Sequence, residues 1–194
     1  MLGIILCGGK SLRMGNDKGL LVYQDELWAQ VAYDKLRLAG LPIKLSVNAT
    51  QQEDYTKHFG LDQLIVDDLS LTIKGPLLGL LSGHSLFPEE DLFLLACDLL
   101  AMEFHLLERL LNEYTAEGSF DAYIFNKGGQ QEPICGIYTA KGLKKIMQLL
   151  KTSGLEKYSM KYILSNLKVF EIALDEKDEK AFTNFNSHAD INGL

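Results

Sequence analysis

Short apolar runs alternate with longer amphipathic segments along almost the whole chain, and this alternation limits the possible folds more than any other feature. Residues 2–7 form a continuous apolar run, as expected for a strand buried on both faces of a parallel sheet. Residues 27–38 carry apolar side chains at roughly helical spacing. Strand–helix–strand repeats join parallel strands by right-handed crossovers, which place helices on both faces of the sheet. The pattern therefore predicts an α/β fold.

The remaining segments continue the alternation. Further strands are expected at 43–47, 64–66, 92–97, 122–125, 134–138 and 169–172. Further helices are expected at 51–58, 77–87, 103–114, 140–150 and 159–164, with a short helix near the C-terminus. No repeat, low-complexity tract or linker separates these elements. We therefore expect one domain over residues 1–194, a three-layer α/β/α sandwich around a mostly parallel, Rossmann-like sheet.

Charge and cysteine content narrow the class of protein. The formal net charge is -7, which argues against binding nucleic acid through its phosphate backbone. Cys7, Cys97 and Cys135 show no paired spacing, which is typical of a reducing compartment. No apolar stretch approaches the roughly 18 residues that a membrane-spanning helix needs. These features predict a cytoplasmic protein without a membrane or nucleic-acid partner.

Polar residues follow several of the expected strands. In open α/β sheets, ligands bind beyond the carboxyl ends of the strands, near the point where the strand order reverses. Gly8 begins such a segment after the first strand, and Asn48 follows the second. Asp68 and Asp98 lie beyond two later strands. We expect these residues to gather along one edge of the sheet.

The segment after the first strand, residues 6–18, combines glycines with basic side chains. Gly8 and Gly9 alone indicate only a turn, but glycines also let backbone N–H groups approach an anion closely. Arg13 and Lys18 supply charge that can neutralise a triphosphate and a departing pyrophosphate. The segment contains Gly9-Lys10-Ser11, but Ile4 stands where the GxxxxGK[ST] pattern of a P-loop needs its first glycine, and the spacing of GxGxxG is also absent, so both of those sites are excluded.

Taken whole, residues 6–18 resemble the LAGGxSxRMGxDK signature of the sugar-nucleotide and molybdenum-cofactor nucleotidyltransferases, with Cys7 in place of the alanine. Further matching segments follow in order at 46–49, 68 with 75–77, 97–98, 132–133 and 184–187. The combination most resembles the molybdenum cofactor guanylyltransferases, which join GMP to molybdopterin. The resemblance implies a fold of the nucleotide-diphospho-sugar transferase type.

The resemblance also implies a role for individual residues. The nucleotide is expected to contact the backbone of the glycine-rich loop at Leu6, Cys7, Gly8 and Gly9. Lys18 is expected at the phosphates, Asn48 and Asp68 at the base and ribose, and Asp98 at Mg²⁺. Chemistry supports the last role, because Mg²⁺ commonly takes one or two carboxylates and completes its shell with phosphates and water. A capping role for Asp98 is disfavoured, because the gap to Glu103 is too long for a capping box.

Two segments depart from the family pattern. A proline usually follows the metal-binding aspartate by two residues, but here the sequence is Asp98-Leu99-Leu100. The loss of that proline predicts a looser loop. Asp25-Glu26-Leu27 stands where a longer, proline-containing segment usually follows the signature lysine. This second segment borders the expected acceptor side of the site.

These features predict transfer of GMP from Mg–GTP to the terminal phosphate of molybdopterin, with release of pyrophosphate. Catalysis would rest on positioning and on charge neutralisation by Mg²⁺, Lys18 and Arg13. The resemblance further implies transient contacts with other cofactor-synthesis proteins. Two alternatives stay open: a relative that uses CTP or another nucleotide with a different phosphorylated acceptor, and a nucleotide-binding module without catalytic activity.

Overall fold

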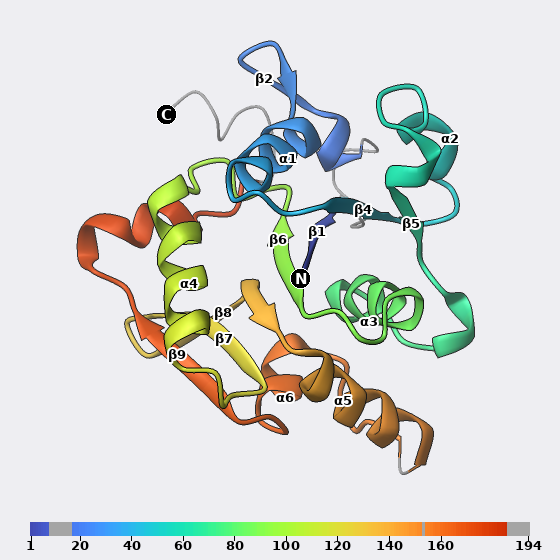
Figure 1. Ribbon diagram of the computed structural model, residues 1–194. Helices are drawn as coiled ribbons and strands as arrows, with labels where there is room; N and C mark the ends of the chain where they lie inside the picture. The colour runs from blue at the N-terminus through green and yellow to red at the C-terminus, as the bar shows by residue number, and fades with distance from the viewer. Residues whose placement is uncertain (8–16, 153, 186–194) are drawn as a thin grey trace.

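A central seven-stranded sheet organises the chain, which a computed structural model describes at residues 1–7, 17–152 and 154–185 (Figure 1). The strand order is β5-β4-β1-β6-β8-β7-β9. The strands are β1 (Leu2–Leu6), β4 (Ile43–Val47), β5 (Leu64–Val66), β6 (Leu92–Ala96), β7 (Ala122–Lys127), β8 (Gln130–Tyr138) and β9 (Val169–Ala173). Strand β8 runs antiparallel to both of its neighbours, whereas the other pairings are parallel. The expected mostly parallel α/β sheet is confirmed.

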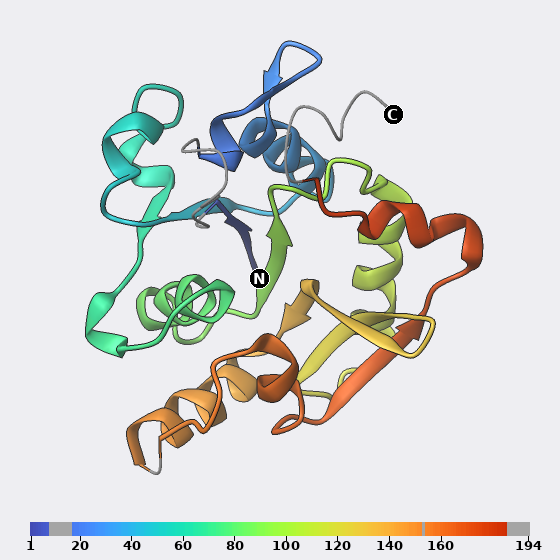
Figure 2. The same cartoon turned by 180° about the vertical axis from the view of Figure 1, so that it is seen from behind.

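Helices cover both faces of this sheet. Figures 1 and 2 show α1 (Trp28–Leu38) and α4 (Phe104–Ala116) on one side, and α3 (Pro76–Leu86), α5 (Ala140–Thr152) and α6 (Met160–Leu164) on the other. The short helix α2 (Gln52–Tyr55) lies between β4 and β5. The short helix expected near the C-terminus is a 3₁₀ segment, η4 (Glu176–Phe182). Other 3₁₀ turns are η1 (Lys18–Leu20), η2 (Leu61–Gln63) and η3 (Leu69–Leu71).

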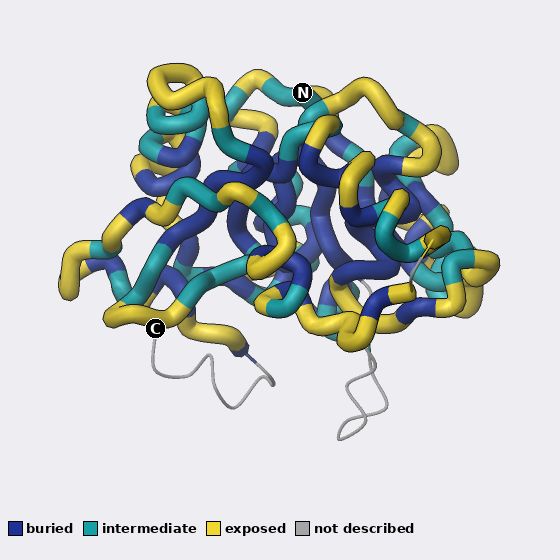
Figure 3. Tube along the Cα trace, turned by 90° about the horizontal axis from the view of Figure 1, so that it is seen from below, coloured by how far each residue is buried: buried dark blue, intermediate teal, exposed yellow. Residues whose placement is uncertain are grey.

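Alternating side chains of the central strands divide the core into two layers. Ile4 and Leu6 of β1 pack with α3 and α5 on one face, whereas Ile5 of β1 and Cys7, the residue after the strand, pack with α1 and α4 on the other. All four side chains are buried, and Figure 3 shows the buried strands enclosed by more exposed helices and loops. Burial on both faces explains why the central strands appear in the sequence as unbroken apolar runs.

A small hairpin was not anticipated from the sequence. Strands β2 (Val22–Tyr23) and β3 (Glu26–Leu27) pair antiparallel around Gln24 and Asp25. Both turn residues have positive φ, at 50° and 66°. Two-residue hairpins require that conformation but usually place Asn or Gly there. The hairpin occupies the shortened segment at which the sequence departs from the family pattern.

Candidate functional site

The carboxyl ends of β1, β4, β5 and β6 lie side by side and bring the expected polar residues to one edge. Backbone hydrogen bonds continue the ladder one residue beyond each strand. Cys7 N donates to Ser46 O at 3.0 Å, and Asp67 N donates to Val47 O at 2.9 Å. The strand order reverses at β1, which has β4 on one side and β6 on the other. This is the position at which doubly wound sheets bind ligands.

An ion pair joins the glycine-rich segment to the strand-end aspartate of β6. Lys18 Nζ lies 2.9 Å from Asp98 Oδ2, although the residues are 80 positions apart in sequence. The two side chains are 19% and 17% exposed. The family resemblance predicts Lys18 at the phosphates and Asp98 at the metal, and in the structure the two side chains are in contact. Gly8, Gly9 and Arg13 lie outside the described residues, so their roles remain predictions.

Asp17 holds the backbone next to Lys18. Its carboxylate accepts hydrogen bonds from Gly19 N and from the hydroxyl of Tyr55, both at 3.0 Å, and from the amide of Gln51. Burial raises the pKa of Asp17, and these three hydrogen bonds oppose that shift. A methyl group at Gly19 would lie 2.1 Å from the Tyr55 hydroxyl oxygen. Lys18 therefore sits in a closely packed turn.

Gln51 ties both flanks of residues 8–16 to helix α2. Its Nε2 donates to Cys7 O at 3.2 Å as well as to the Asp17 carboxylate. Its Oε1 accepts from Asn48 N at 2.8 Å. Neither Gln51 nor Tyr55 was singled out in the sequence, because a short polar helix gives no signal of such contacts.

A pocket of about 510 Å³ opens beside this network. Its apolar lining includes Leu6, Ile73 and Leu78. Asn48 and Asp67 supply polar groups. Few polar groups in a mainly apolar hollow are typical of a small-molecule site. The expected nucleotide residues Leu6 and Asn48 thus share one pocket.

The two consecutive aspartates after β5 have different surroundings. Asp67 lines the pocket and accepts a hydrogen bond from Ser46 Oγ at 3.1 Å, and burial raises its pKa. Asp68 caps η3 by accepting from Ser70 N at 3.0 Å, and the hydrogen bonds from Ser70 lower its pKa. Asp68 is not among the pocket-lining residues. Its expected contact with base or ribose remains a prediction.

Comparison with known proteins identifies the family. The model of the MobA-like NTP transferase domain matches residues 3–166. The chain belongs to this family. A relative from Flavobacterium johnsoniae, named probable molybdenum cofactor guanylyltransferase, is 28% identical over 191 residues, covering 98% of this chain and 94% of the relative. The molybdenum cofactor guanylyltransferase of Campylobacter jejuni strain RM1221 is 31% identical over 184 residues, covering 94% and 89%.

Solved structures support the same fold. Molybdopterin-guanine dinucleotide biosynthesis protein A from Archaeoglobus fulgidus superimposes with a TM-score of 0.77 at 17% identity, covering all of this chain and 96% of the other. The 4-diphosphocytidyl-2C-methyl-D-erythritol synthase of Anaerococcus prevotii gives a TM-score of 0.65 at 11% identity, covering 99% and 92%. The fold is that of the nucleotide-diphospho-sugar transferases, and the chain is a nucleotidyltransferase enzyme.

The loop after Asp98 in this MobA-like enzyme is held from two sides. Lys35 Nζ on α1 donates to Leu100 O at 2.6 Å, and Leu99 O lies 3.5 Å from the same nitrogen. Burial lowers the pKa of Lys35 to about 8. Phe185 N donates to Asp98 O at 3.2 Å. These contacts restrain the backbone where the family proline is missing.

Replacing Lys35 with methionine should lower turnover by about tenfold, because small displacements at a reacting centre can cost up to about a hundredfold. The thermal midpoint should fall only slightly, because the variant leaves the Leu100 carbonyl without its donor but removes the cost of a partly desolvated ammonium. Steady-state kinetics and thermal denaturation measure the two effects. R37M, on an exposed face of the same helix, serves as the control. Wild-type turnover in K35M would show that the loop needs no such restraint.

The described residues contain no group of three or more His, Cys, Asp or Glu that could enclose a metal ion. Asp98 nevertheless suits a magnesium ion, because Mg²⁺ often takes one or two carboxylates and obtains its other ligands from phosphates and water. Its carboxylate already carries a cationic neighbour, the Lys18 ammonium. No helix among these residues is both long and apolar enough to cross a bilayer.

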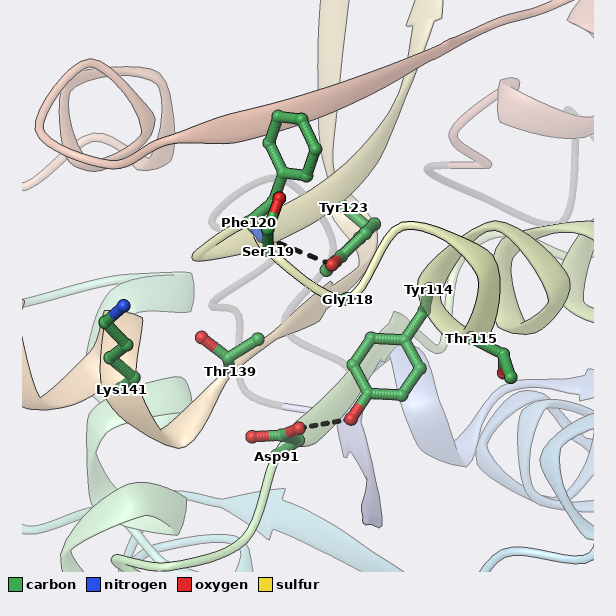
Figure 4. Close-up of a pocket in the computed structure, with 9 residues that line it drawn as sticks. All are labelled: Asp91, Tyr114, Thr115, Gly118, Ser119, Phe120, Tyr123, Thr139 and Lys141. Carbon is green, nitrogen blue, oxygen red and sulfur yellow. Dashed lines mark hydrogen bonds between the residues drawn. The ribbon is translucent and has the colours of Figure 1, made fainter.

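A second pocket of about 480 Å³ lies at the opposite edge of the sheet, near the start of β6 (Figure 4). The most buried polar groups of this pocket form hydrogen bonds with other groups of the chain. Asp91 accepts from Tyr114 Oη at 2.5 Å and from Ala140 N at 2.7 Å. Tyr123 Oη donates to Glu117 O at 2.5 Å. This pocket is separate from the edge that carries Lys18 and Asp98.

Proposed function

We propose that this enzyme transfers GMP from Mg–GTP to molybdopterin, forming the guanine dinucleotide cofactor and releasing pyrophosphate. The observation that carries the proposal is the contact between Lys18 and Asp98 at the edge that also opens the nucleotide-sized pocket. The family and the names of the full-length relatives support the same reaction.

In this proposal the base enters the pocket that Leu6 and Asn48 line, and the phosphates extend towards Lys18. The backbone at Cys7, Gly8 and Gly9 would donate to phosphate oxygens. Asn48 Oδ1 already accepts from Thr50 N at 2.9 Å. Its amide nitrogen would therefore face the nucleotide. Asp68 would contact the ribose or base through the carboxylate oxygen that its cap on η3 leaves unused.

The acceptor phosphate oxygen would attack the α-phosphorus of GTP, and the bond to the bridging oxygen would break with its electron pair leaving on pyrophosphate. An acceptor phosphate is already ionised at neutral pH, so no strong general base is required. Lys18, together with Arg13, would neutralise charge on the leaving group. Asp98 would hold Mg²⁺, which when bound supplies positive charge at the triphosphate oxygens.

We also propose that residues 1–194 act as one cytoplasmic domain. Transient contacts with other cofactor-synthesis proteins would deliver and remove the pterin substrate. The net charge of -7 supports the absence of a nucleic-acid partner.

The test measures nucleotide binding and pyrophosphate release with the same preparation. With Mg²⁺, GTP should raise the thermal midpoint more than ATP, UTP or CTP, since ligand at about 100 times its Kd adds about 2.7 kcal/mol to native-state stability. Pyrophosphate should appear only when GTP and molybdopterin are both present. Release with CTP instead would favour the alternative nucleotide, and GTP binding without release with any acceptor would favour a non-catalytic module.

A further inference from the structure

Asp67 is the carboxylate of the pocket that the nucleotide base would enter, and it occupies a fixed position there. Ser46 Oγ donates to its Oδ1 at 3.1 Å, and Ser46 itself is buried in β4 at 1% exposure. The Asp67 backbone is held as well, because its N–H continues the ladder to Val47 O. The carboxylate is therefore oriented before any ligand arrives.

Hydrogen-bonding capacity remains on this carboxylate. Within residues 1–7, 17–152 and 154–185, Ser46 is the side chain that hydrogen-bonds it, whereas an ionised carboxylate can accept about four hydrogen bonds. The apolar walls formed by Leu6 and Leu78 limit solvation by water. A half-buried carboxylate in such surroundings favours a ligand that brings its own donors.

We propose that Asp67 selects the base, accepting hydrogen bonds from the N1–H and the 2-amino group of guanine. The inference rests on the proposed function and assigns the base specificity of that same site to one residue. Guanine places two donors side by side on one edge, which matches the two oxygens of a carboxylate. Cytosine places one donor beside an acceptor, and the acceptor would face a like-charged oxygen.

The neighbouring groups are less suited to this role. Asp68 belongs to the cap of η3, as its bond to Ser70 N shows, and it does not line the pocket. Lys74 lines the pocket but is exposed and offers donors only. A lysine can contact the O6 of guanine or the O2 of cytosine and therefore distinguishes the two bases poorly. Asp67 is the group whose chemistry separates them.

The discriminating variant is D67N, tested by calorimetric titration with GTP, ITP and XTP in the presence of Mg²⁺. Asparagine keeps the shape and the acceptor for Ser46 but replaces one oxygen with a donor. Xanthine, with N1–H beside a 2-carbonyl group, matches that pair. GTP affinity should fall by at least about tenfold and XTP affinity should rise by at least about tenfold, as expected for hydrogen bonds to a charged group. The wild type should bind ITP, which lacks the 2-amino group, more weakly than GTP.

Two further variants complete the design. D62N changes an exposed aspartate on η2 and should leave the order of the three nucleotides unchanged. D68N tests the neighbouring aspartate directly. A switch from GTP to XTP in D68N instead of D67N would overturn the inference, as would equal weakening of both nucleotides in D67N. Wild-type protein that binds GTP without a switch in D67N would overturn only the inference, whereas wild-type protein that binds no nucleotide would overturn the proposed function as well.

Discussion

Replacement of Asp98 with asparagine should reduce pyrophosphate release by at least about a thousandfold and leave the fold intact. The amide cannot balance the charge of Mg²⁺, and the Lys18 ammonium loses its anionic partner at 2.9 Å. The backbone of the loop should stay in place, because Phe185 N bonds the Asp98 carbonyl rather than its side chain. The thermal midpoint should therefore change little.

The measurement is pyrophosphate release with GTP, molybdopterin and Mg²⁺, alongside thermal denaturation. D62N provides an exposed aspartate-to-asparagine control, since the hydrogen bond that residue 62 accepts from Lys44 uses its backbone oxygen. Near-normal turnover by a correctly folded D98N enzyme would remove Asp98 from the metal site. An unfolded D98N protein together with intact D62N would instead indicate a structural role for the ion pair.

The sheet and its active edge follow from local sequence patterns. Central strands are buried on both faces, so β1 and β6 appear as apolar runs with clear ends. A polar residue directly after such a strand lies at the carboxyl edge, whatever the details of packing. This is why Asn48 and Asp98 could be placed at one edge without coordinates, and why the boundaries of β4 and β5 were predicted correctly.

The supports of the site could not be predicted in this way, because they depend on contacts between distant segments. Gln51 bonds Asp17 and Cys7, which lie 34 and 44 residues earlier. Lys35 bonds a carbonyl 65 residues later. Gln51 is the residue before helix α2 and Lys35 lies on helix α1, and sequence spacing alone predicts that such polar side chains face solvent. Each side chain meets a backbone carbonyl from a distant segment only after the chain has folded, so local sequence gives no sign of the contact.

Sequence patterns also could not show which of two adjacent aspartates lines the pocket. Consecutive residues at the end of a strand point to opposite sides, so Asp67 and Asp68 cannot share an environment. The family resemblance favours Asp68, whereas the structure places Asp67 in the pocket and Asp68 on η3. The two residues differ only in their tertiary surroundings, which sequence patterns do not encode.

Replacement of Lys18 with methionine should lower kcat/KM by at least about a hundredfold, because the variant loses a positive charge directed at the departing pyrophosphate. Exposed Lys57, which pairs with Asp54 on the surface of α2, offers the matched control K57M and should retain wild-type kinetics. A K18M enzyme with wild-type kcat/KM would place Lys18 outside the reaction.

The double variant K18M/D98N tests whether the two residues act as one unit. The effects of replacing residues in direct contact are strongly non-additive, so kcat/KM of the double variant should be within about tenfold of that of D98N alone, rather than reduced by the product of both factors.

The response of the thermal midpoint to Mg²⁺ provides an independent readout. In K18M the half-buried Asp98 carboxylate lacks its ammonium partner, so Mg²⁺ should raise the thermal midpoint of K18M more than that of the wild type. In the double variant, which has no carboxylate at position 98, Mg²⁺ should leave the thermal midpoint unchanged. Multiplicative kinetic losses with equal responses to Mg²⁺ would mean that Lys18 and Asp98 serve separate steps despite their contact.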